Sequence, residues 1–572
     1  MKHSAASLYV KKGVTILVII LVSLVLWMVS ALQEFMVFAP YFFPISGFPL
    51  EKNYLLLFQN DSEARPTGGF ITSYVKLKFR FGIPSFEMND VYSLNGYKDD
   101  IYREPPYPIK ELFSPDTFYK GYAFHDANFS PDFPTSCETL MQFLKDDENM
   151  KDTFDGCIAI NSSLLERMLE IVGPITVRGT EVTSDTVYYT LESIVMNVDK
   201  HNLEEVAKRK GVLREVMSAI QKKAGINLPI YFRLMTMMGQ QADQKEILFH
   251  FSNPKLESLV EKRQWNGRVF SPIEVGQNGD LVQVVETNLG GRKSDRYISK
   301  TIDHTLTVTS EFDDKQRRKI IGETRVGLRH LGYLNEPISN VYQGYLRWYL
   351  PKDAQVLSED KELTVTEELG YKVVGKIVRV NPQTEGTFTL QYQLPYTLLD
   401  TGKLTTYIYK QPGSVRTQYR VSTVFPGEYT VESTDMTTKD HMAYKDFDGL
   451  TNNTKLDLSF KPDGFPPRVA SQQFQALNTI LLEWNEKINP QDCVAANVSM
   501  YDKDTKDTLL SDKVRISSVR CKDNFMTIKT IGIREQPEEF YGVTLKNISD
   551  TSQNLLMPNP REYIVVQRLP KE

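Results

Sequence analysis

Hydrophobic and polar positions change their spacing along the chain, and this predicts where helices and strands lie. The runs 54–58 (YLLLF) and 157–160 (CIAI) are short and continuously apolar, as in strands buried on both faces. After the second run, residues 164–172 repeat at helical spacing behind Asn161 or Ser162 as a helix cap. Strands and helices in alternation predict an α/β layered domain over residues 53–278.

Longer polar stretches complete this domain. Residues 185–224 have a helical pattern interrupted only by Gly211, and residues 246–251 and 254–263 suit a strand and a helix.

After about Gly279 the pattern changes to runs that alternate between apolar and polar residues and are rich in Val, Thr and Tyr. The clearest runs are 297–310, 344–350, 372–380 and 386–394. They predict an antiparallel β-sandwich domain over residues 279–460. Residues 461–467 have the composition of a linker, and strand-like runs in 468–572 predict a separate immunoglobulin-like domain.

The N-terminal segment predicts a membrane anchor. Residues 13–32 carry no charge and are long enough for one transmembrane helix. Three lysines precede them, so residues 1–12 are expected in the cytoplasm and the bulk of the chain outside the cell membrane. Residues 33–52, rich in Phe and Pro, predict a membrane-proximal collar. The alternative is a signal peptide cleaved near Val29 and Ala31.

Composition narrows the function classes. The chain has 572 residues, with 67 basic and 72 acidic side chains, so it lacks the cationic excess of a nucleic-acid-binding protein. Four cysteines fall into two local pairs, Cys137 with Cys157 and Cys493 with Cys521, which outside the cell favours two disulfides. Buried reduced thiols are the alternative.

Residues 60–69 form the densest polar cluster, between two predicted strands. Arg65 could clamp a phosphate, with Gly68 and Gly69 allowing the backbone to approach an anion. The alternative is a tight loop with a surface arginine.

A second polar cluster covers residues 125–134. Asp126 and Asp132 are candidate Mg²⁺ ligands, and Asn128 is a candidate orienting amide. Arg103 could add a phosphate contact. A simple Asx-rich turn explains the same residues. The sequence therefore implies no definite cofactor, and Mg²⁺ is the one metal considered.

Several motifs resemble the domain-of-unknown-function family 4012, membrane-anchored exported bacterial proteins. They include NYLLLFQNDSEARPTGGFITSY at 53–74, DANFSPDFPTS at 126–136 and DGCIAINSSLLERMLEIVGPI at 155–175, and the likeness extends over roughly 50–430. Where that family usually has an arginine before Asp126, this chain has His125. The tail from about 468 resembles bacterial immunoglobulin-like repeats of surface-layer proteins.

A more remote similarity is to the LytR-CpsA-Psr phosphotransferase family. It implies Mg²⁺-dependent transfer of glycopolymers from polyprenyl pyrophosphate, with Arg65 near that family's arginine motif. The aspartate of the motif is replaced here, because Pro66, Thr67 and Gly68 follow Arg65.

Two functions follow as expectations. The first is a single-pass envelope protein with a structural or binding role, whose partners are the membrane, a cell-wall glycan or other envelope proteins. The second is a phosphotransferase or binder acting on polyprenyl-pyrophosphate-linked glycopolymers, with Arg65 and Asn128 as catalytic residues.

Overall fold

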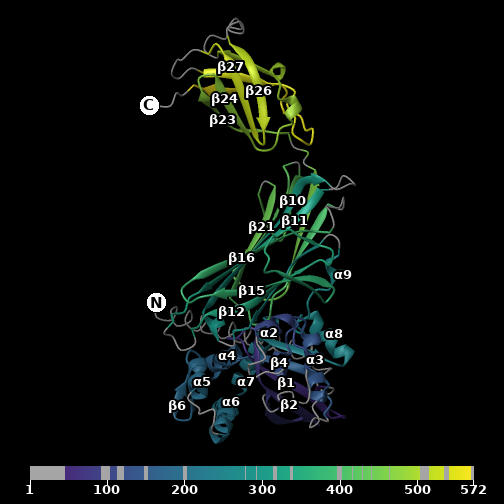
Figure 1. Ribbon diagram of the computed structural model, residues 1–572, viewed down its shortest axis with the longest axis vertical. Helices are drawn as coiled ribbons and strands as arrows, with labels where there is room; N and C mark the ends of the chain where they lie inside the picture. Colours follow the sequence, from purple (N-terminus) through teal and green to yellow (C-terminus); the bar gives the residue numbers. More distant parts are fainter. Residues whose placement is uncertain are drawn as a thin grey trace, which may run out of the picture.

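The computed structural model describes most of the chain beyond residue 44. The described residues are 45–91, 94, 103–112, 121–146, 152–196, 203–276, 279–290, 293–312, 318–334, 339–395, 402–414, 416–427, 429–439, 441–462, 464, 466–502, 514–533 and 540–567. Figure 1 shows three parts along the long axis: a mixed α/β part, a middle β part and a C-terminal β part. Within these ranges no helix is long and apolar enough to cross a membrane. The predicted anchor at 13–32 lies outside the described residues.

The α/β part (residues 45–276) is built on one mixed five-stranded sheet. In spatial order its strands are β3 (Ile83–Asp90), β2 (Phe70–Arg80), β1 (Lys52–Asn60), β4 (Gly156–Asn161) and β7 (Ile247–Phe251). Only β1 and β4 pair in parallel, and the other neighbours are antiparallel. The parallel pair puts the ends of β1 and β4 at the same edge of the sheet.

Helices cover both faces of this sheet. The described helices are α2 (Tyr107–Leu112), α3 (Phe133–Asp146), α4 (Ser163–Val172), α5 (Val187–Met196), α6 (Leu203–Ala224), α7 (Leu228–Asp243), α8 (Pro254–Lys262) and α9 (Pro272–Val275), with a 3₁₀ turn η3 (Phe124–Asp126) and a small hairpin of β5 (Ile175–Val177) and β6 (Thr180–Val182). Leu55 and Leu57 of β1 pack with α3 on one face. Tyr54 packs with α4, α6 and α7 on the other, as alternation along a strand requires.

Two features of the helices differ from the sequence prediction. Gly211 lies inside α6 and does not interrupt it. One glycine costs a helix only about 1 kcal/mol, which packing of the neighbouring turns offsets. Helix α4 does begin after Ser162, but its first free N–H groups are served by Asp61 from the β1–β2 loop: Oδ2 accepts from Ser163 N at 3.2 Å.

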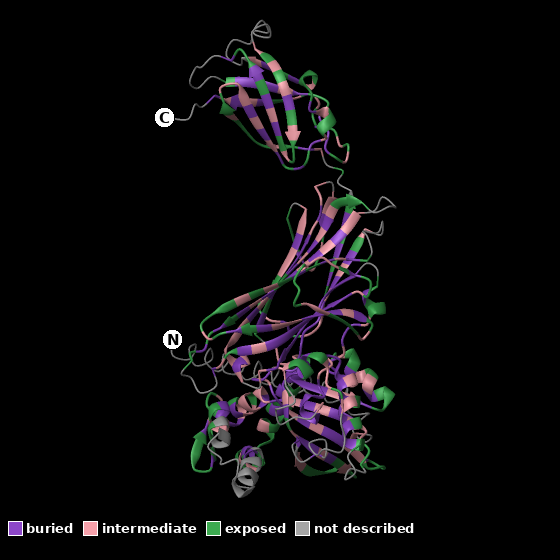
Figure 2. Ribbon diagram, viewed as in Figure 1, coloured by how far each residue is buried: buried purple, intermediate pink, exposed green. Residues whose placement is uncertain are grey.

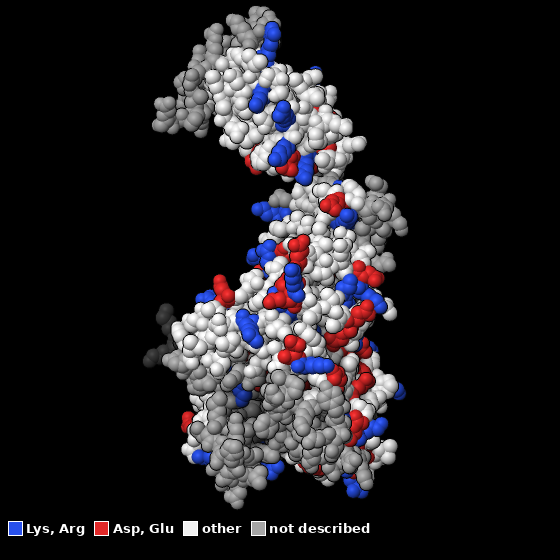
Figure 3. Space-filling model, viewed as in Figure 1, with Lys and Arg blue, Asp and Glu red and all other residues white. Residues whose placement is uncertain are grey.

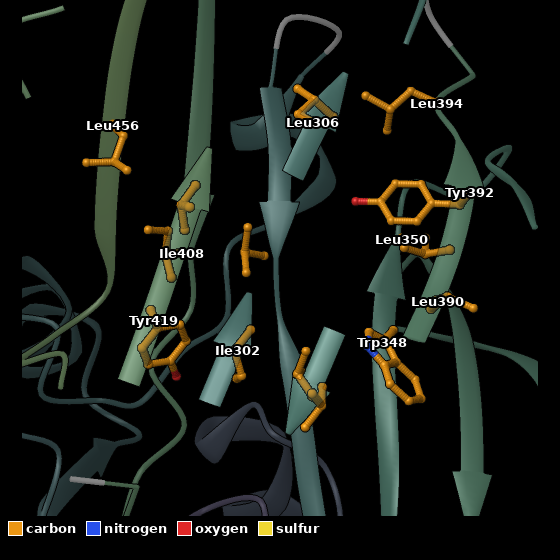
Figure 4. Close-up of a cluster of buried hydrophobic side chains, with 14 of the residues drawn as sticks. Ile302, Leu306, Trp348, Leu350, Leu390, Tyr392, Leu394, Ile408, Tyr419 and Leu456 are labelled. Atoms are coloured by element: carbon orange, nitrogen blue, oxygen red, sulfur yellow. The ribbon is translucent and has the colours of Figure 1, made fainter. Parts of the chain in front are cut away.

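The middle part is a β-sandwich of three sheets around a large apolar core. The seven-stranded sheet has the order β13 (Gln355–Val356), β16 (Glu385–Gln393), β11 (Arg318–His330), β10 (Ile298–Phe312), β18 (Thr417–Val424), β21 (Met442–Phe447) and β20 (Thr437–Lys439). One four-stranded sheet has β14 (Thr364–Glu368), β15 (Tyr371–Val380), β12 (Tyr342–Leu350) and β9 (Val284–Asn288). The other has β19 (Tyr429–Glu432), β22 (Thr454–Pro462), β17 (Lys403–Ile408) and β8 (Gly279–Val282). Side chains from all three sheets meet in the core (Figure 4).

The C-terminal part has two packed sheets with a core of its own. One sheet has β23 (Val469–Ala476), β24 (Thr479–Trp484), β27 (Phe525–Ile531) and β26 (Arg515–Lys522). The other has β25 (Val498–Asp502), β28 (Phe540–Leu545) and β29 (Arg561–Val566). Trp484 is 1% exposed at the centre of this core.

All four cysteines are in disulfides. Cys137 of α3 is bonded to Cys157 of β4, and Cys493 to Cys521 of β26. These are the two local pairs that the sequence favours. Each bond lies within one part of the molecule, so it fixes a helix or loop to a sheet and not one part to another.

Candidate functional site

The two polar clusters meet where the α/β part contacts the middle β part. The loop 61–69 follows β1 at the edge of the sheet that faces the middle part, and η3 packs beside β2. The side chains of Arg65 and Asp126, 61 residues apart in sequence, form an ion pair with Nη2 3.0 Å from Oδ1. The strands that meet at this junction carry buried residues (Figure 2). The site is therefore an internal one, shared by both parts.

Arg65 is 2% exposed, and its partners are all protein groups. Beyond Asp126, Nη2 lies 3.3 Å from Glu63 Oε1, and Nη1 donates to the carbonyl oxygen of Asn288 in β9. The guanidinium also stands 5.2 Å from the centre of the Phe70 ring. Through its two Nη atoms, Arg65 thus binds two carboxylates and a backbone carbonyl of the neighbouring part of the protein.

The carboxylates around Arg65 do not titrate alike. Burial alone would raise the pKa of Asp126, but His125, whose Nε2 lies 3.2 Å from Oδ2, and Arg65 together bring that pKa down to about 2. Burial raises the pKa of Glu63 above its usual value, because Arg65 only partly offsets the desolvation. Asp126 is therefore the permanent counter-charge of Arg65.

Asn128 connects the two loops. It is fully buried, and its Nδ2 lies 2.9 Å from Gln59 Oε1, 2.9 Å from Thr67 Oγ1 and 3.0 Å from the Gly69 carbonyl. Asn128 Oδ1 and Arg65 Nε lack a protein partner among the described residues, and a buried water would satisfy such atoms. The amide positions the β1–β2 loop.

Gly68 and Gly69 are needed for internal packing. Gly68 has φ +133°, and a Cβ there would lie 2.3 Å from Asn161 Oδ1. A Cβ on Gly69 would lie 2.3 Å from the backbone of Asn60. The absence of side chains at these positions lets the loop lie against its own sheet, and both glycines are buried.

Asp132 serves a different purpose from Asp126. Its Oδ2 accepts from Thr135 N at 3.2 Å and from Thr135 Oγ1 at 2.8 Å in the first turn of α3, and its Oδ1 accepts from Val269 N at 3.1 Å. The structure does not give the two aspartates a shared set of contacts. In the part of the chain that is described, no group of three or more His, Cys, Asp or Glu side chains could hold a metal ion.

Arg103 lies apart from this cluster. Its Nη2 is 2.9 Å from Asp146 Oδ2, and its guanidinium is 4.1 Å from the centre of the Phe143 ring. The structure therefore brings together Arg65, Gly68, Gly69, Asp126 and Asn128, but neither Arg103 nor Asp132.

The partners in the middle part are not among the residues predicted from the sequence. Glu286 pairs with Lys300 and accepts from Tyr342, and Gln411 Nε2 donates to the carbonyls of Arg65 at 3.2 Å and Glu286 at 2.8 Å. Lys300 outweighs the effect of burial and keeps the pKa of Glu286 below its usual value. The signal in the sequence is Glu286 directly after Val284 and Val285, because a charged residue in a buried strand needs a partner.

A pair of buried lysines makes a second link across the junction. Lys245 Nζ donates to the Lys410 carbonyl at 3.2 Å, and Lys410 Nζ donates to the Gln244 carbonyl at 2.6 Å. Burial lowers the pKa of both amines, that of Lys245 well below its usual value. Each lysine therefore binds the backbone of the opposite part.

Two cavities lined by described residues lie elsewhere. One of about 530 Å³ lies between α4 and α7, and one of about 460 Å³ lies on β10, β11 and β16. Neither is lined by a residue of the two polar clusters. On the face drawn in Figure 3, basic and acidic side chains are intermingled over the middle part.

Part of the chain is similar to a known protein family. Residues 50–195 match the family described as "Protein of unknown function (DUF4012)", which supports the resemblance for this segment. The matched segment contains Arg65, Asp126 and Asn128, but not their partners in the middle part. No curated protein matches the chain.

Among solved structures, the similarities are low. The N-terminal part of the bacterial S-layer protein SbsC has 15% identity and a TM-score of 0.16, over 19% of this chain and 24% of that one. A Legionella pneumophila protein described as a "putative nutrient binding protein" has 9% identity and a TM-score of 0.23, over 32% of this chain and 72% of that one. The transcriptional regulator yvhJ from Bacillus subtilis has 10% identity and a TM-score of 0.20, over 37% and 76%.

Proposed function

We propose that this is a single-pass, membrane-anchored protein of the bacterial cell envelope with a structural or binding role outside the membrane. The uncharged segment 13–32 behind three lysines supports the anchor and its orientation. Two disulfides support an oxidising compartment for everything that follows. The C-terminal part, two sheets around one core, is proposed to be an immunoglobulin-like module that extends the chain away from the anchor.

The observation that carries the structural role is the burial of Arg65 among protein groups. A phosphate ligand would have to displace Asp126 and Glu63 and separate the α/β part from β9. Removing one partner of a buried ion pair strongly destabilises the folded protein, because the remaining charge stays buried without compensation. We therefore propose that this cluster joins two parts of an envelope protein.

Fractionation of cells that produce the full-length chain tests location and anchorage. The protein is expected to stay in the membrane pellet under alkaline carbonate and to be digested by protease added outside spheroplasts. Its cysteines are expected to react with a maleimide only after reduction. Release by carbonate, protection from protease or free thiols in the native protein would each contradict the proposal.

A phosphotransferase or binder of polyprenyl-pyrophosphate-linked glycopolymers is the second candidate. It is favoured by the meeting of Arg65, Asp126 and Asn128 at one strand end, where α/β sheets often bind ligands. The test is titration of the full-length protein in detergent with a polyprenyl-pyrophosphate saccharide, with and without Mg²⁺. Mg²⁺-dependent binding that Asp126→Asn abolishes, while the variant remains folded, would favour this candidate over the first.

A further inference from the structure

Large apolar side chains are exposed at the end of the α/β part that points away from the middle part. Five belong to the entering chain and the β2–β3 hairpin, namely Phe48, Leu50, Phe81, Ile83 and Phe86, and two belong to the α6–α7 turn, namely Ile226 and Leu228. Ile83 is 72% exposed and Ile226 97%. We call these seven residues the apolar pole. Exposed apolar side chains gathered at one end of a soluble part indicate a contact surface.

Two elements that start or end at the junction place both turns at this far end. Strand β2 begins beside the buried loop 61–69 and runs for 11 residues, about 36 Å, before its turn. Helix α7 ends next to Lys245 at the junction, and its 16 residues put its start about 24 Å away. Figure 1 shows β2 and α6 at the end opposite the C-terminal part.

The entering chain is fixed to the hairpin turn. Phe81 N donates to the Gly47 carbonyl at 3.0 Å and Gly82 N to the Ser46 carbonyl at 2.8 Å. Gly47 has φ +72°, and a Cβ there would lie 2.2 Å from the Phe79 carbonyl oxygen, so the contact requires glycine. The Phe48 and Phe81 rings meet edge to face, 5.9 Å apart. The first described residues therefore leave the protein at the apolar pole itself.

The length of chain before this point limits how far the pole stands from the anchor. Twelve residues, 33–44, separate the uncharged segment from Ile45. At full extension they span at most about 43 Å. If residues 13–32 cross the membrane, the pole faces the membrane surface from within that distance.

Basic residues beside the pole match the charge of anionic phospholipids. The Arg80 guanidinium lies 6.0 Å from the centre of the Phe81 ring, and Lys222 and Lys223 are in the last turn of α6 before Ile226. Aromatic and aliphatic side chains flanked by lysine and arginine are suited to the boundary between headgroups and acyl chains.

We propose that the apolar pole rests in the outer surface of the bilayer in which the chain is anchored, so that the α/β part sits on the lipid and the β parts project from it. This inference depends on the anchorage proposed above. It names a second, non-spanning contact with the same membrane, made by Phe81, Ile83 and Ile226 and their neighbours.

An environment-sensitive fluorophore on a single cysteine tests this contact. All native cysteines are in disulfides, so an introduced cysteine is the one free thiol. Full-length Ile83→Cys and Ile226→Cys proteins are labelled with a nitrobenzoxadiazole maleimide and reconstituted into vesicles of phosphatidylethanolamine and phosphatidylglycerol. The matched control is Ile273→Cys in α9, an isoleucine that is 92% exposed and lies near the middle part. Nitroxide-labelled lipid is expected to quench the fluorophore at 83 and 226 at least about threefold more than at 273.

The possible results separate failure of the membrane contact from failure of the anchorage. A protein that resists carbonate extraction but shows equal quenching at 83, 226 and 273 overturns the contact and leaves the anchor intact. If the fluorophore at 83 shows a blue shift that grows with protein concentration, and nitroxide lipid does not quench it, the pole contacts a second copy of the chain. That result also overturns the membrane contact. Full release by carbonate overturns the anchorage, and the contact with it.

Discussion

The middle β part is connected to its two neighbours in different ways. Its junction with the α/β part buries ion pairs and hydrogen-bonded lysines, among them Arg65–Asp126 and Lys245–Lys410. The C-terminal part follows through residues 461–467 and has its own core and its own disulfide. A buried network between two parts is satisfied only when both parts are folded and in contact. Two parts joined only by a linker can unfold independently. We therefore expect two cooperative units: residues 45–460 as one, and the C-terminal part as the other.

The largest expected effect is from Arg65→Ala. It leaves Asp126 and Glu63 buried without their cation, and loss of one partner from a buried pair costs about 3–5 kcal/mol. Hydrogen exchange read by mass spectrometry in increasing denaturant should show the α/β and middle parts opening together at lower denaturant, with β24 and β27 unchanged.

Arg420→Ala is the matched control for this prediction. Arg420 also pairs with an aspartate, Asp446 at 2.7 Å, but on the surface, where solvent screens the two charges and the pair adds little to stability. The two-unit interpretation would be contradicted if Arg420→Ala destabilised the protein as much as Arg65→Ala. It would also be contradicted if Arg65→Ala destabilised the C-terminal part as much as the rest.

Next in size is the loss of each disulfide. The disulfides close loops of 20 residues at Cys137–Cys157 and 28 residues at Cys493–Cys521. Each lowers the entropy of the unfolded chain and so stabilises the folded state by about 3 kcal/mol. Replacing both cysteines of one pair by alanine should lower the denaturation midpoint of its own unit only. Calorimetry of the two double variants would refute the two-unit picture if either one lowered both transitions.

Acid should weaken the first unit more than the second. Asp126 has a pKa of about 2 in the folded protein, below the ordinary value of 3.8, so its contribution is complete above pH 4 and is lost as the pH falls from about 4 to about 2. The shift corresponds to about 2 kcal/mol. Denaturant titrations across this pH range should show a steeper loss in the native protein than in Asp126→Asn, and parallel curves would contradict the assignment.

The smallest expected effect is from Asp132→Ala. This change removes the acceptor of Thr135 N at the start of α3 and should cost about 1–2 kcal/mol in the first unit. Asp132→Asn keeps an acceptor oxygen and should cost less. Thermal unfolding followed by circular dichroism distinguishes them, and a larger loss from Asn than from Ala would argue against the capping role.

The elements with a repeating pattern could be predicted from sequence. Strands β1 and β4 are continuous apolar runs, and the strands of the middle part alternate, because burial on two faces or one face dictates these patterns. Helix α7 is not predicted, because apolar residues such as Tyr231, Phe232 and Met235 lie on its exposed face as well, so the sequence shows no separate polar face.

The candidate site could be predicted in part. Loops after β1 and before α3 were expected to be functional, and Arg65 and Asp126 do lie together. Their burial could not be foreseen, because it depends on Asn288 and Gln411, which lie more than 200 residues further along the chain. The local pattern of residues does not show which distant residues will be in contact.

The reciprocal contacts of Lys245 and Lys410 limit which fragments of the chain can fold by themselves. The family-matched segment ends at residue 195, yet Arg65 in that segment has hydrogen-bond partners as far along the chain as Asn288 and Gln411. A fragment that ends before Gly279 would lack the partners of Lys245 and Arg65 in the middle part. The surface that these contacts bury would then be exposed. The smallest portable piece of this protein is thus the pair of parts together, and transfer of the matched segment alone into another chain is expected to yield an aggregating polypeptide.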